Sequence, residues 1–222
     1  MKRKIITTGD GSTTIHIAGW NEQYHSKHGA INEAYHVFID NGLALLEGQR
    51  PVSILEIGFG TGLNAFVTFL EAEKRGLTIN YTGIEAYPVA ESEWRALNYP
   101  EQLGIPDYET IFEHLHKCLW EESHAITSFF NLTKQQKKFQ ELTGTNNYNL
   151  IYFDAFGARV QPELWTEAIF AIMYRALRPG GILVTYAAKG SVRRAMQVVG
   201  FIVERLPGPP GKREMLRARK IT

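Results

Sequence analysis

Three glycines between an apolar strand and a helix restrict the fold of this chain more than any other feature. Residues 52–57 form a short apolar run, Gly58, Gly60 and Gly62 follow at alternate positions, and residues 63–75 have helical spacing. Glycines at such a turn let the backbone bend tightly and approach a ligand closely. The segment therefore predicts the first strand–helix unit of an open α/β sheet, with a ligand bound beyond the carboxyl end of the strand.

Strands and helices continue to alternate along the rest of the chain. We expect further strands over residues 79–85, 147–153 and 181–186, helices over 88–97, 162–176 and 192–199, and a closing antiparallel pair over 201–206 and 214–219. Such alternation predicts an α/β fold of the Rossmann-like type, with a mostly parallel sheet and helices on both of its faces.

A small extension is predicted in front of this alternating pattern. Apolar positions alternate over 5–17 around a turn at 8–12, which is a hairpin signature, and residues 29–46 have helical spacing. We expect residues 1–48 to form a hairpin and helix packed on a Rossmann-like domain over 49–222. Residues 100–145 fit the pattern less well, and there we expect a strand over 126–132, its helix over 134–142, and helix and loop over 105–123.

Composition restricts the kind of protein further. Hydrophobic residues make up 44% of the 222 positions, enough to fill the core of one α/β domain. A single cysteine, Cys118, excludes an internal disulfide and a cysteine metal cluster, so we expect no metal and a reducing compartment. Neither a signal peptide nor a long apolar window is visible, and we expect a cytoplasmic protein without membrane contact. The formal net charge of +1 favours no particular partner.

Two acidic residues indicate which nucleotide the glycine turn binds. Glu85 ends the second predicted strand, where a carboxylate can accept hydrogen bonds from ribose hydroxyls. Glu56 stands directly before the turn, where it would repel a pyrophosphate but suit the sulfonium and amino group of S-adenosyl-L-methionine (AdoMet). Alternatively, Glu56 makes only a local pair or cap. We predict an AdoMet site of the class I type; a dehydrogenase is disfavoured by Glu56 and by the lack of a separate substrate domain.

Several motifs carry a resemblance to a known family. They are YHS at 24–26 followed by Gly29, EIGFGTGLN at 56–64, EAYP at 85–88, FDAF at 153–156, PELW at 162–165, VRR at 192–194 and GKREM at 211–215. Together they resemble the MnmC methyltransferase domains and their standalone MnmD relatives, in order along nearly the whole chain. Residues 100–145 are the weak part of the match.

The resemblance implies an enzyme that acts on tRNA. It implies transfer of a methyl group from AdoMet to the primary amine of 5-aminomethyl-2-thiouridine at the wobble position, giving 5-methylaminomethyl-2-thiouridine. Bifunctional family members also carry a flavin oxidoreductase domain, and we expect this chain to resemble the single-activity form, without flavin and without an obligate protein partner. AdoMet is expected to contact Glu56, Gly58, Gly60, Gly62, Asn64, Glu85 and Asp154.

The resemblance also implies roles on the substrate side. Asp154, at the end of the fourth strand, would face the methyl group and hold the amine or take its proton. Phe156 would stack on the uracil ring, as aromatic residues do on splayed-out RNA bases. Tyr24, His25 and Tyr186 are weaker candidates for the pocket wall. Without the family match, Asp154 would equally suit a cap or turn residue.

Basic residues near the C-terminus are the candidates for RNA contacts. Arg194, Lys212 and Arg213 are expected to bind phosphates or bases of the tRNA, and the alternative is a solvated basic end of the chain. Many methyltransferases hold adenine with an Asp after the third strand, whereas residues 129–133 read FFNLT, so the adenine contact stays unassigned. Two other functions stay open, namely a small-molecule amine N-methyltransferase and a non-catalytic AdoMet- or RNA-binding module.

Overall fold

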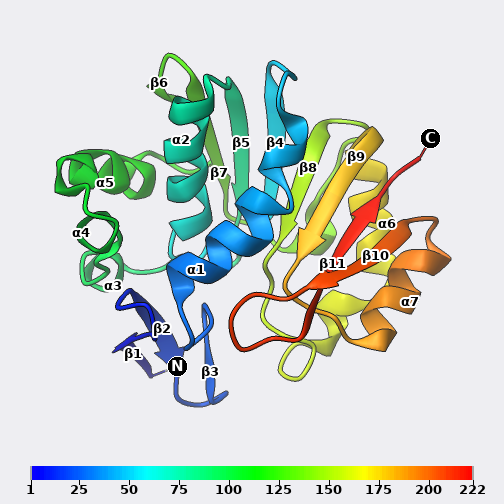
Figure 1. Cartoon of the computed structure of the whole chain (residues 1–222), viewed down its shortest axis with the longest axis horizontal. Coiled ribbons are helices and arrows are strands. Elements are labelled where there is room, and N and C mark those ends of the chain that lie inside the picture. Colours follow the sequence, from blue (N-terminus) through cyan, green and yellow to red (C-terminus); the bar gives the residue numbers. More distant parts are fainter. Residues whose placement is uncertain (1, 222) are drawn as a thin grey trace.

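A single eight-stranded sheet runs through the middle of the protein in our computed structural model, which describes residues 2–221 (Figure 1). The strands are β4 (Val52–Ile57), β5 (Ile79–Ile84), β6 (Ser123–Thr127), β7 (Phe130–Gln135), β8 (Tyr148–Phe153), β9 (Leu177–Thr185), β10 (Ile202–Pro207) and β11 (Glu214–Arg219). Their order is β10-β11-β9-β8-β4-β5-β7-β6, and the five central strands are parallel. The order reverses between β4 and β8, and ligands bind at such a point in open α/β sheets.

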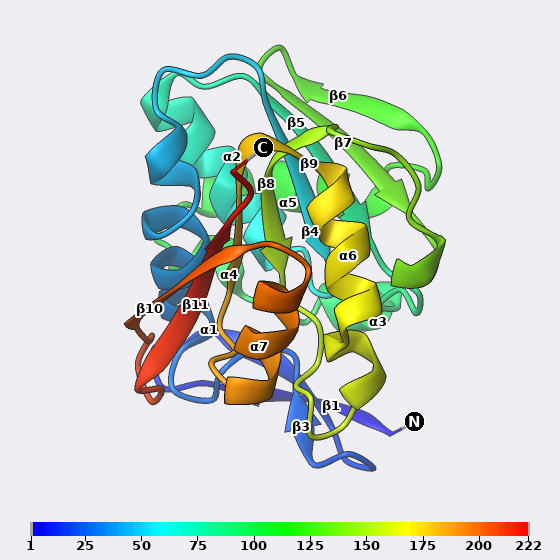
Figure 2. The ribbon, with the colours of Figure 1, turned by 90° about the vertical axis from the view of Figure 1, so that its right-hand side faces the viewer.

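Helices cover both faces of this sheet, as the alternating pattern predicts. Figure 2 shows α1 and α2 on one side of the strands and α6 on the other. The helices are α1 (Ala30–Ala34), α2 (Leu63–Arg75), α3 (Glu91–Trp94), α4 (Tyr99–Gln102), α5 (Glu109–Lys117), α6 (Glu167–Ala176) and α7 (Gly190–Val198). Within the part of the chain that the structure describes, none of these helices is long and apolar enough to cross a membrane.

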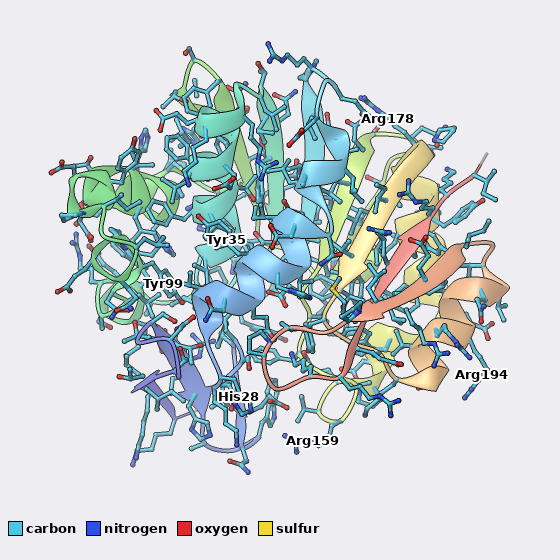
Figure 3. All side chains as sticks on the ribbon, viewed as in Figure 1. His28, Tyr35, Tyr99, Arg159, Arg178 and Arg194 are labelled. Atoms are coloured by element: carbon cyan, nitrogen blue, oxygen red, sulfur yellow. The ribbon has the colours of Figure 1, made fainter. Side chains whose placement is uncertain are left out.

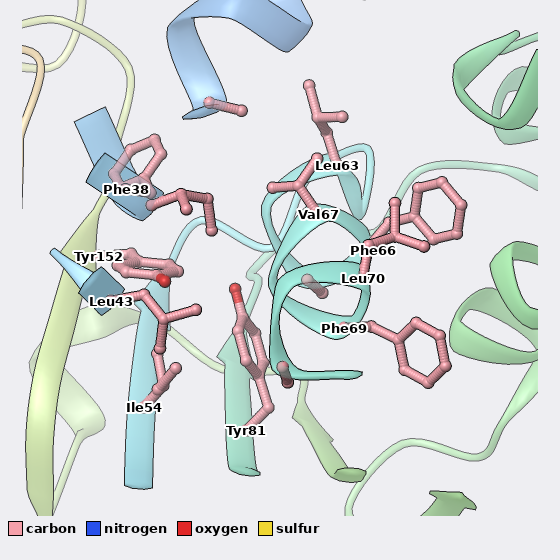
Figure 4. Packing of buried hydrophobic residues seen from close by; sticks show 14 of the residues in the cluster. Phe38, Leu43, Ile54, Leu63, Phe66, Val67, Phe69, Leu70, Tyr81 and Tyr152 are labelled. Carbon is pink, nitrogen blue, oxygen red and sulfur yellow. The ribbon is translucent and has the colours of Figure 1, made fainter. Parts of the chain in front are cut away.

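The unit β4–α2 has the bounds that the sequence predicts. Its helix begins after Gly62 and ends at Gly76, both in the left-handed backbone region that glycine tolerates. Apolar residues at helical spacing, among them Leu63, Val67 and Leu70, are buried in the core that surrounds α2 (Figure 4). Because side chains alternate along a strand, Ile54 packs in this α2 core while Leu55 packs in a second core under α6 and α7.

A three-stranded antiparallel sheet lies at the end of the main sheet where the parallel strands finish (Figure 1). Its strands are β1 (Arg3–Thr7), β2 (Thr13–Ile17) and β3 (Glu22–Gln23), so the predicted hairpin gains a third strand. Its turn is fixed by Asp10, whose carboxylate accepts hydrogen bonds from the Thr8 hydroxyl (2.8 Å) and the Ser12 amide (3.1 Å). Asn98 fastens the hairpin to the main domain, since its side-chain amide accepts from Thr13 N at 2.8 Å and donates to Gly11 O at 3.0 Å.

The predicted helix over 29–46 is interrupted in the structure. After α1 the chain continues as π-helix over Tyr35–Asp40 and as 3₁₀-helix over Leu43–Leu46. Apolar side chains of both segments, among them Phe38 and Leu43 in Figure 4, are buried in the same core as α2. The division of the chain at residue 48 stays a prediction.

The expectations for residues 126–142 are wrong. Instead of one strand and a helix, β6 and β7 form an antiparallel hairpin, and only Phe139–Glu141 makes a 3₁₀ turn. Alternate residues of β7, Phe130, Leu132 and Lys134, are buried, and this period of two is that of a strand. Lys134 breaks the apolar alternation in the sequence although it is buried. Its ammonium donates to His116 O (2.5 Å) and faces the Trp120 ring at 4.9 Å.

Candidate active site

A cavity of about 1090 Å³ opens where the parallel strands end and the N-terminal sheet begins. Its walls come from the N-terminal extension, the turn after β4, the ends of β5, β8 and β9, and the loop between β10 and β11. The lining residues used below are Trp20, Tyr24, His25, Glu33, Gly58, Gly60, Glu85, Lys138, Phe139, Gln140, Asp154, Phe156, Tyr186 and Lys212. The volume is that of a site for a cofactor-sized ligand together with a second reactant.

The glycine turn forms one wall of this cavity. Gly58 has φ 91°, and a Cβ atom there would lie 2.8 Å from the backbone oxygen of Asp154. Gly60, with φ 48°, donates its amide to Glu85 Oε2 at 3.1 Å. The turn thus requires glycine both for its conformation and for the close approach of β8, and it leaves backbone exposed to the cavity.

Glu85 lies at the end of β5 and faces the cavity from beside the turn. Its second carboxylate oxygen, Oε1, accepts from the Tyr87 amide at 2.9 Å, so two backbone amides fix the side chain. Burial raises the pKa of this carboxyl, and the two amide hydrogen bonds oppose the rise. The geometry suits a carboxylate that accepts hydrogen bonds from vicinal hydroxyls.

Asn64, Glu56 and Asp154 form a hydrogen-bonded group beneath the turn. The Asn64 side-chain amide donates to Glu56 Oε1 at 2.9 Å and to Asp154 Oδ2 at 2.8 Å, and the Tyr81 hydroxyl donates to Glu56 Oε2 at 2.9 Å. Glu56 is fully buried, which raises its pKa well above the usual range. Of the three, only Asp154 lines the cavity. Glu56 and Asn64 therefore support the site from below.

Among the carboxyl groups that line the cavity, Asp154 has the pKa that is shifted most from its ordinary value. Burial raises its pKa to about 7, the nearby Glu33 carboxylate adds to the rise, and the Asn64 hydrogen bond and Lys212 oppose it. Its backbone amide donates to Ile57 O at 3.0 Å, which continues the pairing of β8 with β4 and fixes the side chain at the strand's carboxyl end. A carboxyl with a pKa near neutrality can accept or release a proton at physiological pH.

Aromatic side chains form the wall beside Asp154. The Phe156 ring meets Tyr24 and Trp20 edge to face, with centroids 4.9 and 5.5 Å apart. The Tyr186 hydroxyl donates to Ala155 O at 2.8 Å, which holds this ring against the end of β8. The structure thus brings Tyr24, Phe156 and Tyr186 into one cavity with Asp154, and it adds Trp20, which sequence reasoning missed.

The three basic candidates lie in different surroundings in the structure. Lys212 lines the cavity, where its ammonium lies 2.5 Å from Glu33 Oε2 and 3.7 Å from the centroid of the Tyr186 ring. Arg213 and Arg194 are exposed and lie outside the cavity lining, on the β10–β11 loop and on α7. Figure 3 shows Arg194 and Arg159 toward the cavity end of the molecule and Arg178 at the opposite end.

The cavity wall next to the third parallel strand differs from the expectation. That strand is β7, which ends at Gln135, so residues 129–133 lie before its carboxyl end. Lys138, Phe139 and Gln140, which follow the end of β7, line the cavity together with Glu85. An adenine contact is therefore expected from these residues, which the misplaced helix over 134–142 concealed.

Two further residues of the N-terminal extension reach the site, and sequence reasoning gave them little or no weight. Glu33 is buried on α1, within a segment whose helical spacing gave no sign of a cavity carboxylate. His25 is also buried, with Nε2 2.6 Å from the Thr61 hydroxyl oxygen. Burial lowers the pKa of His25 to about 4, so its ring is neutral at pH 7. Among residues 2–221, no group of three or more His, Cys, Asp or Glu side chains is arranged to hold a metal ion.

Comparison with known proteins agrees with this geometry. A family model described as S-adenosyl-L-methionine-dependent methyltransferase matches residues 108–221. The chain belongs to this family. The predicted membership of an AdoMet-dependent methyltransferase family is thereby confirmed, and the dehydrogenase alternative is set aside. The roles of the individual site residues stay predictions.

Curated relatives extend the similarity over nearly the whole chain and confirm the family resemblance seen in the motifs. The bifunctional protein MnmC of tRNA 5-methylaminomethyl-2-thiouridine biosynthesis is 28% identical in Aromatoleum aromaticum, over 97% of this chain and 35% of the relative. The Cupriavidus metallidurans protein of the same name is 30% identical, over 96% of this chain and 33% of the relative. The chain thus spans about a third of the length of these relatives.

Solved structures show the same fold. The crystal structure of MNMC2 from Aquifex aeolicus superposes with a TM-score of 0.81 at 23% identity, over all of this chain and 70% of that one. Spermidine synthase from Thermotoga maritima superposes with a TM-score of 0.60 at 12% identity, over 98% of this chain and 68% of that one. At these identities, the likeness concerns the fold alone.

Proposed function

We propose that this protein N-methylates the 5-aminomethyl group of 2-thiouridine at the tRNA wobble position, with AdoMet as the methyl donor, to give 5-methylaminomethyl-2-thiouridine. The observation that carries the proposal is the pairing of Asp154 with the aromatic wall of Phe156, Tyr24 and Trp20 in one cavity. A carboxyl group with a pKa of about 7 can exchange a proton with a substrate amine, and an aromatic wall can stack on a nucleobase. The relatives named for biosynthesis of this nucleoside support the choice of substrate.

The donor site is proposed along the glycine turn. Gly58 and Gly60 line the cavity, and Glu85, held by two backbone amides, is oriented to accept from ribose hydroxyls. Asn64 Oδ1, buried beneath the turn, has no hydrogen-bond partner within residues 2–221, and a bound water would satisfy it. When bound, AdoMet supplies a methyl group on a sulfonium leaving group. The residues described fit this donor.

The acceptor chemistry is proposed to depend on Asp154. A primary aliphatic amine is protonated at neutral pH, and its nitrogen needs a free lone pair before an N–C bond can form as the S–C bond breaks. The Asp154 carboxylate can orient the ammonium and take its proton, which then passes to water. Since no enzyme nucleophile is needed, orientation of the two reactants supplies most of the rate enhancement.

The aromatic wall is proposed to hold the base. An extruded wobble base would place its ring against Phe156, with Tyr24 and Trp20 bracing that ring edge to face. Exposed arginines near the cavity mouth, such as Arg194 and Arg213, would bind phosphates of the anticodon stem-loop. We also propose that the reaction proceeds in the cytoplasm without metal, flavin or an obligate protein partner.

The test is methyl transfer from isotope-labelled AdoMet, followed by mass analysis of tRNA nucleosides. tRNA that bears 5-aminomethyl-2-thiouridine should gain one methyl group at the wobble nucleoside, and an unmodified transcript should gain none. tRNA that bears the carboxymethylaminomethyl group should also be inert. Equal labelling of modified and unmodified tRNA would show that the target nucleoside is wrong, and labelling of free amines alone would indicate a small-molecule methyltransferase.

A further inference from the structure

An ion pair between a buried carboxylate and a half-buried ammonium joins α1 to the β10–β11 loop in the wall of the cavity. Glu33, on α1, is 4% exposed, and its Oε2 lies 2.5 Å from the ammonium of Lys212, on the β10–β11 loop. Glu33 Oε1 accepts from the Ser26 amide at 3.1 Å, which fixes the carboxylate. Lys212 also lies against the face of Tyr186, and the hydroxyl of Tyr186 is bonded to Ala155 O beside Asp154.

The position of this pair is not explained by stability. The Lys212 side chain is 31% exposed, and an ion pair with one partner partly in solvent contributes little to stability. Lys212 is also poorly placed for an RNA phosphate, because its ammonium is occupied by Glu33 and by the Tyr186 ring. Both charges instead line the same cavity as Asp154. An electrostatic role toward that carboxyl accounts for their placement.

The charges that act on Asp154 come from every side of the site. From β4 and β5, Glu56 and Tyr81 interact with it electrostatically, and from β9 Tyr186 does so. Glu33 and Lys212 act on it with opposite sign, since the carboxylate raises its pKa and the ammonium lowers it. Glu56 and Tyr81 are fully buried, and Tyr186 remains a neutral phenol at physiological pH because its pKa is raised. Glu33 and Lys212 are thus the two cavity-lining charges that act on Asp154.

We propose that Glu33 and Lys212 are opposed positioning residues for Asp154, the carboxylate favouring its protonated form and the ammonium favouring its ionised form. Together they keep Asp154 able to receive a proton from an ammonium substrate and to release it again. The link to catalysis rests on the proposed function, whereas the effect on Asp154 itself does not. Lys212 is accordingly a part of the amine site, in place of the phosphate contact expected from the sequence.

The test is a direct titration of Asp154 by carbon-13 NMR of the whole chain labelled at the aspartate carboxyl carbon. The chain has only four aspartates, Asp10, Asp40, Asp107 and Asp154, and Asp154→Asn identifies the resonance. Glu33→Gln should lower the titration midpoint of Asp154 by about one pH unit, and Lys212→Met should raise it by about as much. The double variant should titrate near the wild type, and Lys212→Arg, which keeps the charge, should also do so.

A matched control lies on the hairpin that carries Lys212. Glu204→Gln removes the partner of Arg217, an ion pair of 2.7 Å outside the cavity, and should leave the Asp154 midpoint unchanged. Circular dichroism and thermal melts check that each variant is folded. If Glu33→Gln does not fold, the comparison of Lys212→Met with Lys212→Arg decides the question.

The inference is overturned if Lys212→Met leaves the midpoint where it is in the wild type, or if both single variants move it in the same direction. Loss of tRNA affinity in Lys212→Met without a shifted titration would likewise overturn it and return Lys212 to the phosphate role. If the midpoints move as expected while modified tRNA receives no methyl group, the proposed function fails and the positioning role stands. In an active enzyme, the pH profile of single-turnover methyl transfer should move with the NMR midpoint.

Discussion

Replacing Asp154 by asparagine removes its ability to take a proton while keeping its shape. The amide oxygen of the new side chain can still accept from the Asn64 amide, which lies 2.8 Å from Asp154 Oδ2 in the structure. If Asp154 accepts the proton of the substrate amine, the single-turnover rate should fall by about 10²–10⁴-fold, the range for a positioned acid–base group. That loss corresponds to about 3–5 kcal/mol of transition-state stabilisation.

The pH dependence of the wild-type rate follows from the same carboxyl. With a pKa of about 7, Asp154 is protonated in acid and ionised in alkali. The rate should therefore rise with pH and level off above neutrality, and at one pH unit below the midpoint it should be about one tenth of the plateau. The Asp154→Asn variant should lose this step.

The assay is single-turnover methyl transfer with saturating tRNA that bears the aminomethyl group, measured between pH 5 and 9. Calorimetry with S-adenosylhomocysteine should show nearly unchanged binding, because the change removes proton transfer and keeps the Asn64 contact. Asp40→Asn is the matched control, since Asp40 is exposed and lies outside the cavity lining. A near-normal rate in Asp154→Asn would refute the catalytic role and leave Asp154 as a structural residue at the end of β8.

Three further variants test the proposed donor site, the glycine turn and RNA docking separately. Glu85→Ala should weaken AdoMet binding by about 1–3 kcal/mol, the scale for hydrogen bonds to a charged acceptor, and unchanged calorimetric affinity would contradict the ribose role. Gly58→Ala should destabilise the fold by about 1–3 kcal/mol in thermal melts, because Cβ would meet the Asp154 backbone oxygen at 2.8 Å; a wild-type melting temperature would disprove this. Replacing Arg194 and Arg213 with alanine should raise KM for tRNA and reduce the salt slope by about one unit per lost contact, and unaltered binding would return both to a solvated edge.

The donor side of the site could be predicted from sequence because its signals are local. Strand β4, the three glycines and helix α2 are consecutive, and each has the period of its own element, so even the bounds agree. The end of β7 could not be predicted, because buried Lys134 breaks the apolar alternation that would have marked a strand. The search for an adenine contact was therefore directed at residues 129–133, which lie before the end of β7, and the contact stayed unassigned.

The residues on the proposed acceptor side could not all be predicted, because tertiary contacts bring them together and no local sequence pattern reveals such contacts. Lys212 looked like one of several basic residues near the C-terminus, yet it folds back onto Glu33, 179 positions earlier. Trp20 lies in a turn of the N-terminal sheet, and only the folded chain places it against Phe156. In both cases the tertiary partner determines the role of the residue, and sequence spacing carries no information about that partner.

Both sides of the cavity use the ends of the central strands, but the two terminal segments contribute mainly to the acceptor side, and this has a consequence for substrate choice. The central strands and their turns build the wall proposed for the donor, with Gly58 and Glu85. The N-terminal extension and the C-terminal hairpin supply Tyr24, Glu33 and Lys212 to the wall proposed for the acceptor. Because a common fold can carry different substrate sites, changes in these terminal segments should alter the amine that is accepted while AdoMet binding persists.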